Sequence, residues 1–202
     1  EQIPTESYEP HDRVKVYITK VEKTSRGPQV FVSRTHPGLL RRLFEMEVPE
    51  IYDGTVEIKS IAREAGDRSK VSVYTANEEI DPGGACVGAR GARVQAISNE
   101  LSGEKIDIVE WSEDPVVFVA NALSRSKVLN VQVDEEERST TVIVPDYQLS
   151  LAIGKRGQNA RLAAKLTGWK IDIKSETDAR ELGIYPVDGE MFEESENNGL
   201  AD

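Results

Sequence analysis

The chain has 202 residues, of which 30% are charged and 38% hydrophobic, and its formal net charge is −11. This composition is typical of a soluble globular protein, and no apolar run approaches the roughly 18 residues of a membrane span. Residues 1–12 are polar, so no signal peptide is predicted, and Glu1 in place of Met indicates a fragment of a longer protein. A single cysteine, Cys86, excludes an internal disulfide and argues against zinc, which favours a reducing cytoplasmic compartment.

Residues 1–36 are predicted to be the last part of an OB-fold β-barrel. Residues 13–18 alternate between apolar and polar, and residues 29–33 form a second strand-like run after a Gly-Pro turn. Because two strands alone are marginally stable in water, we expect the earlier barrel strands to precede residue 1. Lysines and arginines interleaved with Tyr17 and Phe31 suit single-strand binding, although an ordinary solvated hairpin explains them equally well.

Residues 37–112 predict a first α+β module. A helix is expected at residues 39–44, and strands at 55–62 and 69–74. The pattern Gly88-Ala89-Arg90-Gly91 then lies between two helical stretches, and Ile106-Asp107-Ile108 predicts a closing strand.

Residues 113–180 repeat this order, with the second Gly-x-x-Gly pattern 66 positions after the first. A helix after Asp114 and strands at 128–133 and 140–144 precede Gly154-Lys155-Arg156-Gly157, and a helix at 158–167 and a strand at 169–174 follow it. Because only polar chain follows Lys174, each module takes its helix and hairpin from before the loop. The predicted fold is therefore α+β, with the partial barrel followed by two tandem KH domains of the bacterial type (type II, α-β-β-α-α-β).

The negative charge is not spread evenly. Residues 148–174 contain six basic side chains and one acidic one, whereas acidic residues dominate after residue 175. We expect residues 181–202 to be a disordered acidic tail that aids solubility, with shielding of the basic surface as the alternative. A polyanion responds to the local field, so the total charge does not exclude nucleic acid.

The two glycine loops are the expected RNA-binding sites. Glycines let phosphates approach the backbone, the following helix offers free N–H groups, and cations between the glycines meet phosphate. The alternative, a simple helix connector, is weaker for the second loop, which has two cations where the first has one. The predicted RNA-binding residues are Gly88, Ala89, Arg90, Gly91, Arg93, Gly154, Lys155, Arg156, Gly157, Asn159 and Arg161.

Other side chains predict no catalytic, metal or cofactor site. His11 and His36 are isolated, and we expect them to lie at the surface or to cap helices. We expect Cys86 to lie in the core, and Trp111 and Trp169 to pack against neighbouring side chains. No nucleophile with a paired base or phosphate-binding loop of the Walker type is present, so we do not expect an enzyme.

Three runs resemble the NusA family of bacterial transcription elongation, termination and antitermination factors. They are Leu-Phe-Glu-Met-Glu-Val-Pro-Glu-Ile at 43–51, Gly-Glu-Lys-Ile-Asp-Ile-Val at 103–109 and Leu-Ser-Leu-Ala-Ile-Gly-Lys-Arg-Gly-Gln-Asn at 149–159. The resemblance covers about residues 8–180 and departs at Gly83, where the family usually has valine.

The resemblance implies that a barrel of the ribosomal S-one type and both KH domains form one extended surface for single-stranded nascent RNA. It implies regulation of RNA polymerase pausing, termination and antitermination with other Nus factors. We expect a monomer that needs no cofactor. The polymerase-binding domain of the family lies N-terminal and is absent here. The alternatives are another KH and OB protein, ribosome-associated or appended to an exoribonuclease, and a scaffold that has lost RNA binding.

Overall fold

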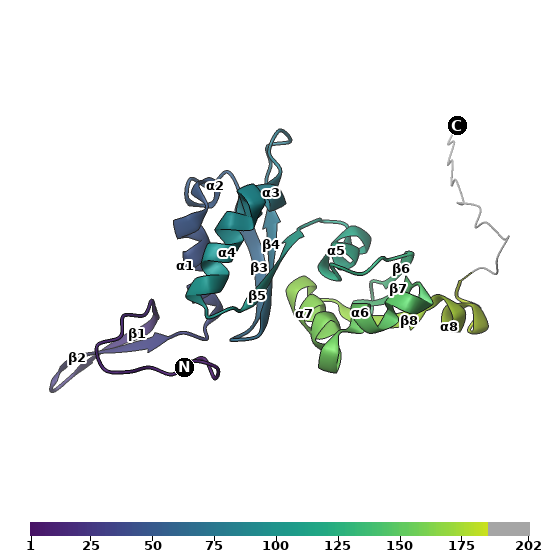
Figure 1. Ribbon diagram of the computed structural model, residues 1–202. Helices are drawn as coiled ribbons and strands as arrows, with labels where there is room; N and C mark the ends of the chain where they lie inside the picture. Colours follow the sequence, from purple (N-terminus) through teal and green to yellow (C-terminus); the bar gives the residue numbers. More distant parts are fainter. Residues whose placement is uncertain (186–202) are drawn as a thin grey trace.

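The computed structural model describes residues 1–185, so most of the predicted acidic tail, residues 186–202, lies outside the described residues. An N-terminal segment and a β-hairpin precede two units of order α-β-β-α-α-β, each closed by a three-stranded sheet (Figure 1). The predicted α+β fold and the bacterial-type element order of the two KH domains are confirmed. None of the helices within residues 1–185 is long and apolar enough to cross a membrane.

The first unit follows the apolar pattern of its sequence closely. Its elements are α1 (Pro37–Glu47), α2 (Pro49–Tyr52), β3 (Glu57–Glu64), β4 (Arg68–Tyr74), α3 (Pro82–Val87), the 3₁₀ turn η1 (Ala89–Gly91), α4 (Ala92–Glu100) and β5 (Lys105–Glu110). Helix α1 begins with proline after the cap residue His36, and its apolar face of Leu39, Leu40, Leu43 and Phe44 is buried.

The second unit repeats these elements. They are α5 (Pro115–Ala122), β6 (Asn130–Asp134), β7 (Ser139–Val144), the 3₁₀ turn η2 (Asp146–Gln148), α6 (Leu149–Ile153), the 3₁₀ turn η3 (Lys155–Gly157), α7 (Gln158–Thr167) and β8 (Lys170–Ser175). In each sheet the first two strands pair antiparallel, and the middle strand pairs parallel with the last, so that Val71 lies opposite Ile108 and Val142 opposite Ile173.

A helix that the sequence analysis did not predict follows the second sheet. α8 (Glu176–Glu181) is capped by Ser175, whose hydroxyl accepts a hydrogen bond from the Asp178 N–H. Ala179 is buried, and the Gln132 amide donates to the Ile184 carbonyl, which fixes the chain beyond the helix. The first residues of the predicted tail, 181–185, are therefore part of the folded structure.

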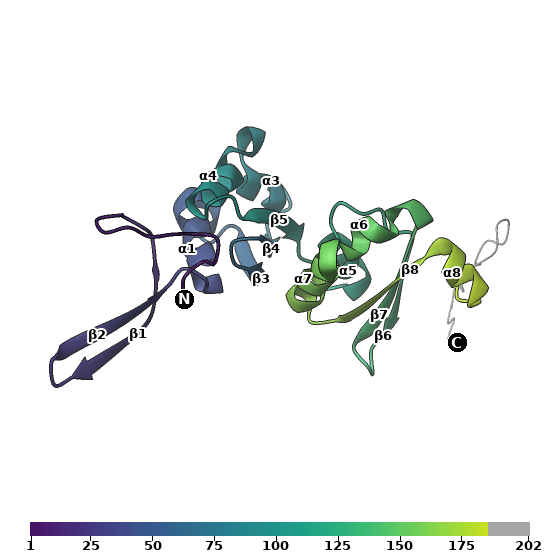
Figure 2. The same ribbon diagram turned by 60° about the horizontal axis from the view of Figure 1, so that its bottom comes forward.

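The N-terminal 36 residues form a two-stranded sheet and a segment that returns to the first unit. Strands β1 (Tyr17–Thr24) and β2 (Gly27–Ser33) extend away from both units in both views (Figures 1 and 2), and the apolar side chains Ile18, Val21 and Val30 are exposed. The first strand begins at residue 17 rather than 13. The hairpin agrees with the sequence analysis, while its membership of a barrel stays a prediction.

The segment before β1 is anchored on the first unit by Ile3 and Arg34. Ile3 is fully buried in the core that contains Leu40 and Phe44. The guanidinium of Arg34 donates to both carboxylate oxygens of Glu6 at 2.9 and 2.8 Å, and to the Glu100 carbonyl at 2.9 Å. These hydrogen bonds hold the pKa of Glu6 down at about 2, so the segment is fastened by an ionised pair.

The first sheet is covered on both faces. Val71 and Val73 on β4 point into the core with α1 and α4, while the alternate residue Ser72 faces the opposite side. On that opposite side, Ala62 and Val109 belong to the core of the second unit. Helices α5 and α7 contact this sheet and lie beside it (Figure 1), so the two units share a packed seam.

Candidate nucleic-acid interface

The two glycine loops have the same backbone conformation. Gly88 has φ 77° and ψ 174°, and Gly154 has φ 81° and ψ 166°. Each glycine ends the helix before its loop in a conformation that residues with a side chain rarely adopt. Arg90 (φ 55°, ψ 29°) and Arg156 (φ 57°, ψ 26°) are both left-handed, which is rare for residues with a side chain. Repeated strain of this kind at one position is typical of functional loops.

The first glycine of each loop permits a close approach within the protein. A Cβ on Gly154 would lie 2.7 Å from the backbone nitrogen of Asn159, and a Cβ on Gly88 would lie 2.7 Å from Cγ of Arg93. The sequence analysis assigned these glycines to phosphate approach. In the structure they let the two helices around the loop meet.

The second glycine of each loop opens onto free space. Gly91 and Gly157 have φ 73° and 72°, and a Cβ on either would meet no atom within 4 Å. Each is the N-cap of the following helix, α4 or α7, and neither helix has a side-chain cap hydrogen bond. The N–H groups of Ala92 and Gln158, the first residues of these helices, donate to the Ala89 and Lys155 carbonyls, and the positive end of each helix dipole faces an anion that approaches the glycine.

Arg93 and Asn159 occupy the same place, five residues after the first glycine of their loops, and both are held by the protein. Arg93 donates to the Ala85 carbonyl at 2.7 Å and to the Glu50 carboxylate at 2.9 Å. Asn159 is 4% exposed and its amide donates to the Ala152 carbonyl at 2.9 Å. Both side chains tie the second helix of the loop to the first, a role that the sequence analysis did not predict.

The cations between the glycines face solvent. Arg90, Lys155 and Arg156 are exposed, and within residues 1–185 no ion pair is formed by their side chains. The second loop thus offers two cations beside its open glycine and the first loop offers one. A backbone with one negative charge per nucleotide fits this arrangement.

Arg161, also predicted to bind RNA, lies between the two units. Its Nη2 is 2.5 Å from the Glu64 carboxylate at the end of β3, and its Nη1 donates to the Arg156 carbonyl at 3.0 Å. Next to it, the Gln158 amide donates to the Asp67 carboxylate at 2.6 Å. Glu64 and Asp67 were missed by the sequence analysis because nothing local marks a partner 91 or 97 positions away.

A cavity of about 620 Å³ adjoins the second loop at the junction of the units. Its wall includes Gly154, Lys155 and Arg156 from the second unit, and Lys105 from the start of β5. Arg125, which has φ 76° in the loop after α5, also lines it. The junction therefore adds exposed cations to those of the loop, and neither Lys105 nor Arg125 has a pattern in the sequence that would have singled it out.

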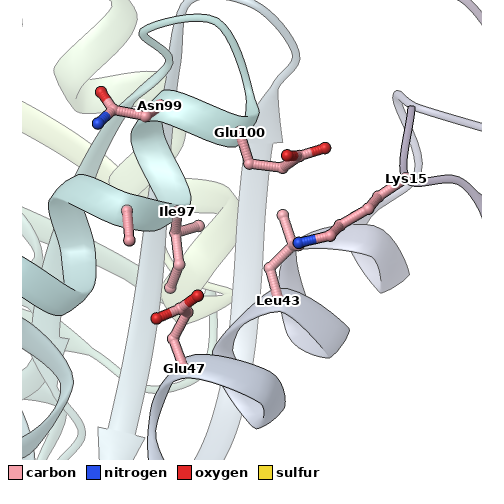
Figure 3. A pocket seen from close by; sticks show the side chains of 7 residues that line it. Lys15, Leu43, Glu47, Ile97, Asn99 and Glu100 are labelled. Carbon is pink, nitrogen blue, oxygen red and sulfur yellow. The ribbon is translucent and has the colours of Figure 1, made fainter. Parts of the chain in front are cut away.

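A second hollow of about 390 Å³ lies between the N-terminal segment and the first unit. Figure 3 shows the Lys15 side chain extending across it towards Leu43, with Glu47 and Glu100 on either side. Glu100 is paired with Arg34 at 3.2 Å. No group of three or more metal-ligating side chains occurs in this hollow or elsewhere in residues 1–185.

The remaining candidates have structural surroundings. Cys86 is buried, and desolvation raises the pKa of its thiol to about 12. His36 caps α1 by accepting a hydrogen bond from the Gly38 N–H at 2.8 Å. Trp111 packs edge-on against Tyr74. These contacts agree with the core, capping and packing roles predicted for the three side chains.

Comparisons with known proteins match the two units separately. A model described as "NusA-like first KH domain" matches residues 34–111, and one described as "NusA-like second KH domain" matches residues 115–181. A solved structure described as "Crystal structure of APE1850" has a TM-score of 0.50 and 24% identity, over 67% of this chain and 95% of that chain. At that identity the likeness concerns the fold alone.

Three curated relatives share the description "Transcription termination/antitermination protein NusA". The protein of Bacillus subtilis is 79% identical over 96% of this chain and 52% of its own length. Those of Mycobacterium bovis and Thermus thermophilus are 55% and 54% identical over 87% and 86% of this chain, and 51% and 45% of their own lengths. The chain thus spans about half the length of the relatives that it matches.

Proposed function

The chain belongs to the NusA family, and from this premise we propose that it binds single-stranded RNA through the two glycine loops of its KH domains. The observation that carries the proposal is the pair of loops with one conformation, each with an open second glycine and a cation beside it. A phosphate placed at that glycine meets the positive end of a helix dipole and a cationic side chain together.

The predicted RNA-binding residues differ in whether the side chain already has a partner within the protein. Arg90, Lys155 and Arg156 are free within the described residues to meet phosphate, and Gly91 and Gly157 allow the backbone of the RNA to come close. Ala89, Gly88 and Gly154 shape the loops, while Arg93 and Asn159 support them from behind. Contacts of Arg93, Asn159 and Arg161 with RNA stay predictions.

We further propose that the RNA is a nascent transcript and that the protein acts on transcription. The names of the relatives carry this proposal, since all three are described as termination and antitermination proteins. RNA polymerase and other Nus factors are the proposed partners, with the protein acting as a cytoplasmic monomer. Contact with the polymerase is expected to need the half of the relatives that this chain does not span.

The proposed experiment is a titration with single-stranded RNA and with DNA of the same sequence at two salt concentrations. A variant with Gly91→Asp and Gly157→Asp adds bulk and negative charge at both clamps and is expected to lose binding. Gly54→Asp is the matched control, because Gly54 also has a positive φ (83°) and open space but lies in the turn before β3. Equal RNA binding by the double variant and the control would refute the clamp assignment.

A further inference from the structure

Each glycine loop is braced by one arginine and one glutamate, but the glutamates come from different places. In the first loop, Arg93 pairs with Glu50 of α2 in the same unit at 2.9 Å. In the second loop, Arg161 pairs with Glu64 of β3, which belongs to the first unit. The first loop is thus supported from within its own unit and the second from the neighbouring unit.

We propose that Glu64 and Arg161 are positioning residues that give the second clamp its RNA-binding shape only when it is docked on the first unit. This inference rests on the RNA binding proposed above. The Arg161 guanidinium bridges the Glu64 carboxylate and the Arg156 carbonyl, at 2.5 and 3.0 Å. That carbonyl belongs to the peptide whose N–H, on Gly157, donates to the Gly154 carbonyl at 3.0 Å. Holding it fixes the peptide plane at the open glycine.

The anchor on the first unit is itself rigid. Glu104 is fully buried, where it pairs with Arg63 and accepts hydrogen bonds from the Gly66 N–H and the Ser69 hydroxyl. These contacts fix the turn between β3 and β4 that presents Glu64. A buried and fully hydrogen-bonded ion pair resists displacement, so the turn can impose its position on the loop.

A second tether joins the same turn to the same loop. Asp67 accepts from the Gln158 amide at 2.6 Å, and Gln158 is the first residue of α7. The two acidic side chains of the turn therefore hold the helix at its first and fourth residues. Together with the apolar seam beneath α7, two contacts about one turn apart set the direction of the helix on the first unit.

The first loop lacks this arrangement and serves as an internal comparison. Gln95 lies seven residues after Gly88, as Arg161 lies seven after Gly154, and its amide donates to Asn99 on the same helix at 2.9 Å. Loss of the bridge is therefore expected to change the second loop and leave the first unchanged.

The positioning role makes a prediction opposite in sign to simple electrostatics. If Glu64 were only an acid beside the RNA path, Glu64→Gln would remove repulsion and tighten binding. If it holds Arg161, the same change weakens binding by about 3- to 10-fold, the scale of one partly exposed hydrogen-bonded ion pair. The salt dependence stays the same because no phosphate contact is lost.

The test is a titration of the whole chain with single-stranded RNA of about ten nucleotides, enough for two four-nucleotide clamps. Glu64→Gln, Arg161→Gln and their combination are compared with Glu78→Gln and Lys165→Gln, which remove the same charges at exposed positions outside the bridge. We expect each bridge variant to weaken binding, the combination to weaken it no further, and the salt slope to match the unchanged protein. The Gly157 amide resonance is expected to shift in Glu64→Gln, while that of Gly91 stays in place.

Two results would overturn the inference while leaving the proposed function intact. One is tighter or unchanged binding by Glu64→Gln with an unmoved Gly157 resonance. The other is a salt slope reduced by about 0.7 in Arg161→Gln alone, which identifies Arg161 as a direct phosphate ligand. Failure of the unchanged protein to bind RNA would instead refute the proposed function, and the inference with it.

Discussion

Both KH domains carry the tripeptide Ile-Asp-Ile on their last strand, but the aspartate meets different surroundings in each. Asp107 is 12% exposed and accepts from Arg68 at 2.8 Å and from Lys70 at 3.0 Å. Asp172 is 64% exposed and pairs with Lys174 at 3.2 Å. The same residue is thus part of the seam in the first domain and part of the solvated surface in the second.

This difference follows from the position of the two domains in the chain. The first domain has the second packed on the outer side of its sheet, where Lys70 is fully buried and its ammonium also donates to Ser124 at 2.8 Å. Burial lowers the pKa of Lys70, and the nearby Asp107 carboxylate opposes that shift. A repeated sequence therefore specifies each domain's own fold, while stacking decides which copies of a residue become structural.

The largest expected effect separates the two aspartates. Asp107→Ala leaves the buried ammonium of Lys70 without its charged partner and is expected to lower the free energy of unfolding by about 3 kcal/mol. Asp172→Ala, on an exposed pair, is expected to change it by less than about 0.5 kcal/mol. Chemical denaturation of both variants measures the difference, and equal losses would show that the seam does not distinguish the domains.

The next effect separates the first glycines of the loops. Gly154→Ala brings a Cβ to 2.7 Å from the backbone nitrogen of Asn159, whereas Gly88→Ala brings one to 2.7 Å from Cγ of Arg93. Both changes strain a positive φ, but a backbone nitrogen has no other rotamer to adopt, so we expect the free energy of unfolding to fall by about 3 kcal/mol for Gly154→Ala and by about 2 kcal/mol for Gly88→Ala. Denaturation midpoints rank the two variants, and a larger loss for Gly88→Ala would contradict the contact geometry.

A smaller effect concerns acid, to which the N-terminal anchor makes the first domain sensitive. Because the pKa of Glu6 is lowered to about 2, the Glu6–Arg34 pair stabilises the fold above the ordinary glutamate pKa, and this contribution is lost as pH falls towards 2. We expect the free energy of unfolding to fall by up to about 2 kcal/mol between neutral pH and about pH 3, since solvent screens part of the pair. Glu6→Gln is the comparison variant and is expected to show a weaker loss over that range.

The smallest effect concerns the clamps themselves. Lys155→Ala with Arg156→Ala removes two exposed cations and is expected to flatten the salt slope of RNA binding by about 1.4, against about 0.7 for Arg90→Ala. Titration at several salt concentrations gives both slopes. Equal slopes for the two variants would mean that both loops make the same number of phosphate contacts despite their unequal charge.

Sequence alone predicted the features that depend on near neighbours. The apolar spacing in α1 and α7, the turns before the strands and the two glycine loops are local patterns, and the structure contains them with shifts of a few residues at strand ends. The short helix α8 was not predicted because Ala179 is its only buried residue, and one apolar position gives no helical period. The burial of Ile3 was not predicted because a single apolar side chain in a polar segment does not indicate that it fills a core.

The roles within the loops were harder to foresee. Gly-x-x-Gly predicts where a loop occurs, but the partner of Asn159 is a backbone carbonyl, which any residue at position 152 would provide. Arg161 looked like one more cation on a basic helix until the structure placed Glu64 beside it. When the two partners of a contact lie in different domains, their separation in the sequence follows no regular spacing, so the sequence does not reveal the contact.

The seam also decides where the chain can be divided. Ala62 and Val109 lie in the first domain's sheet but fill the second domain's core, so a cut at residues 111–114 would leave both halves with incomplete interiors. For this chain the unit with a complete interior is the pair of domains, although the unit of repetition is the single domain.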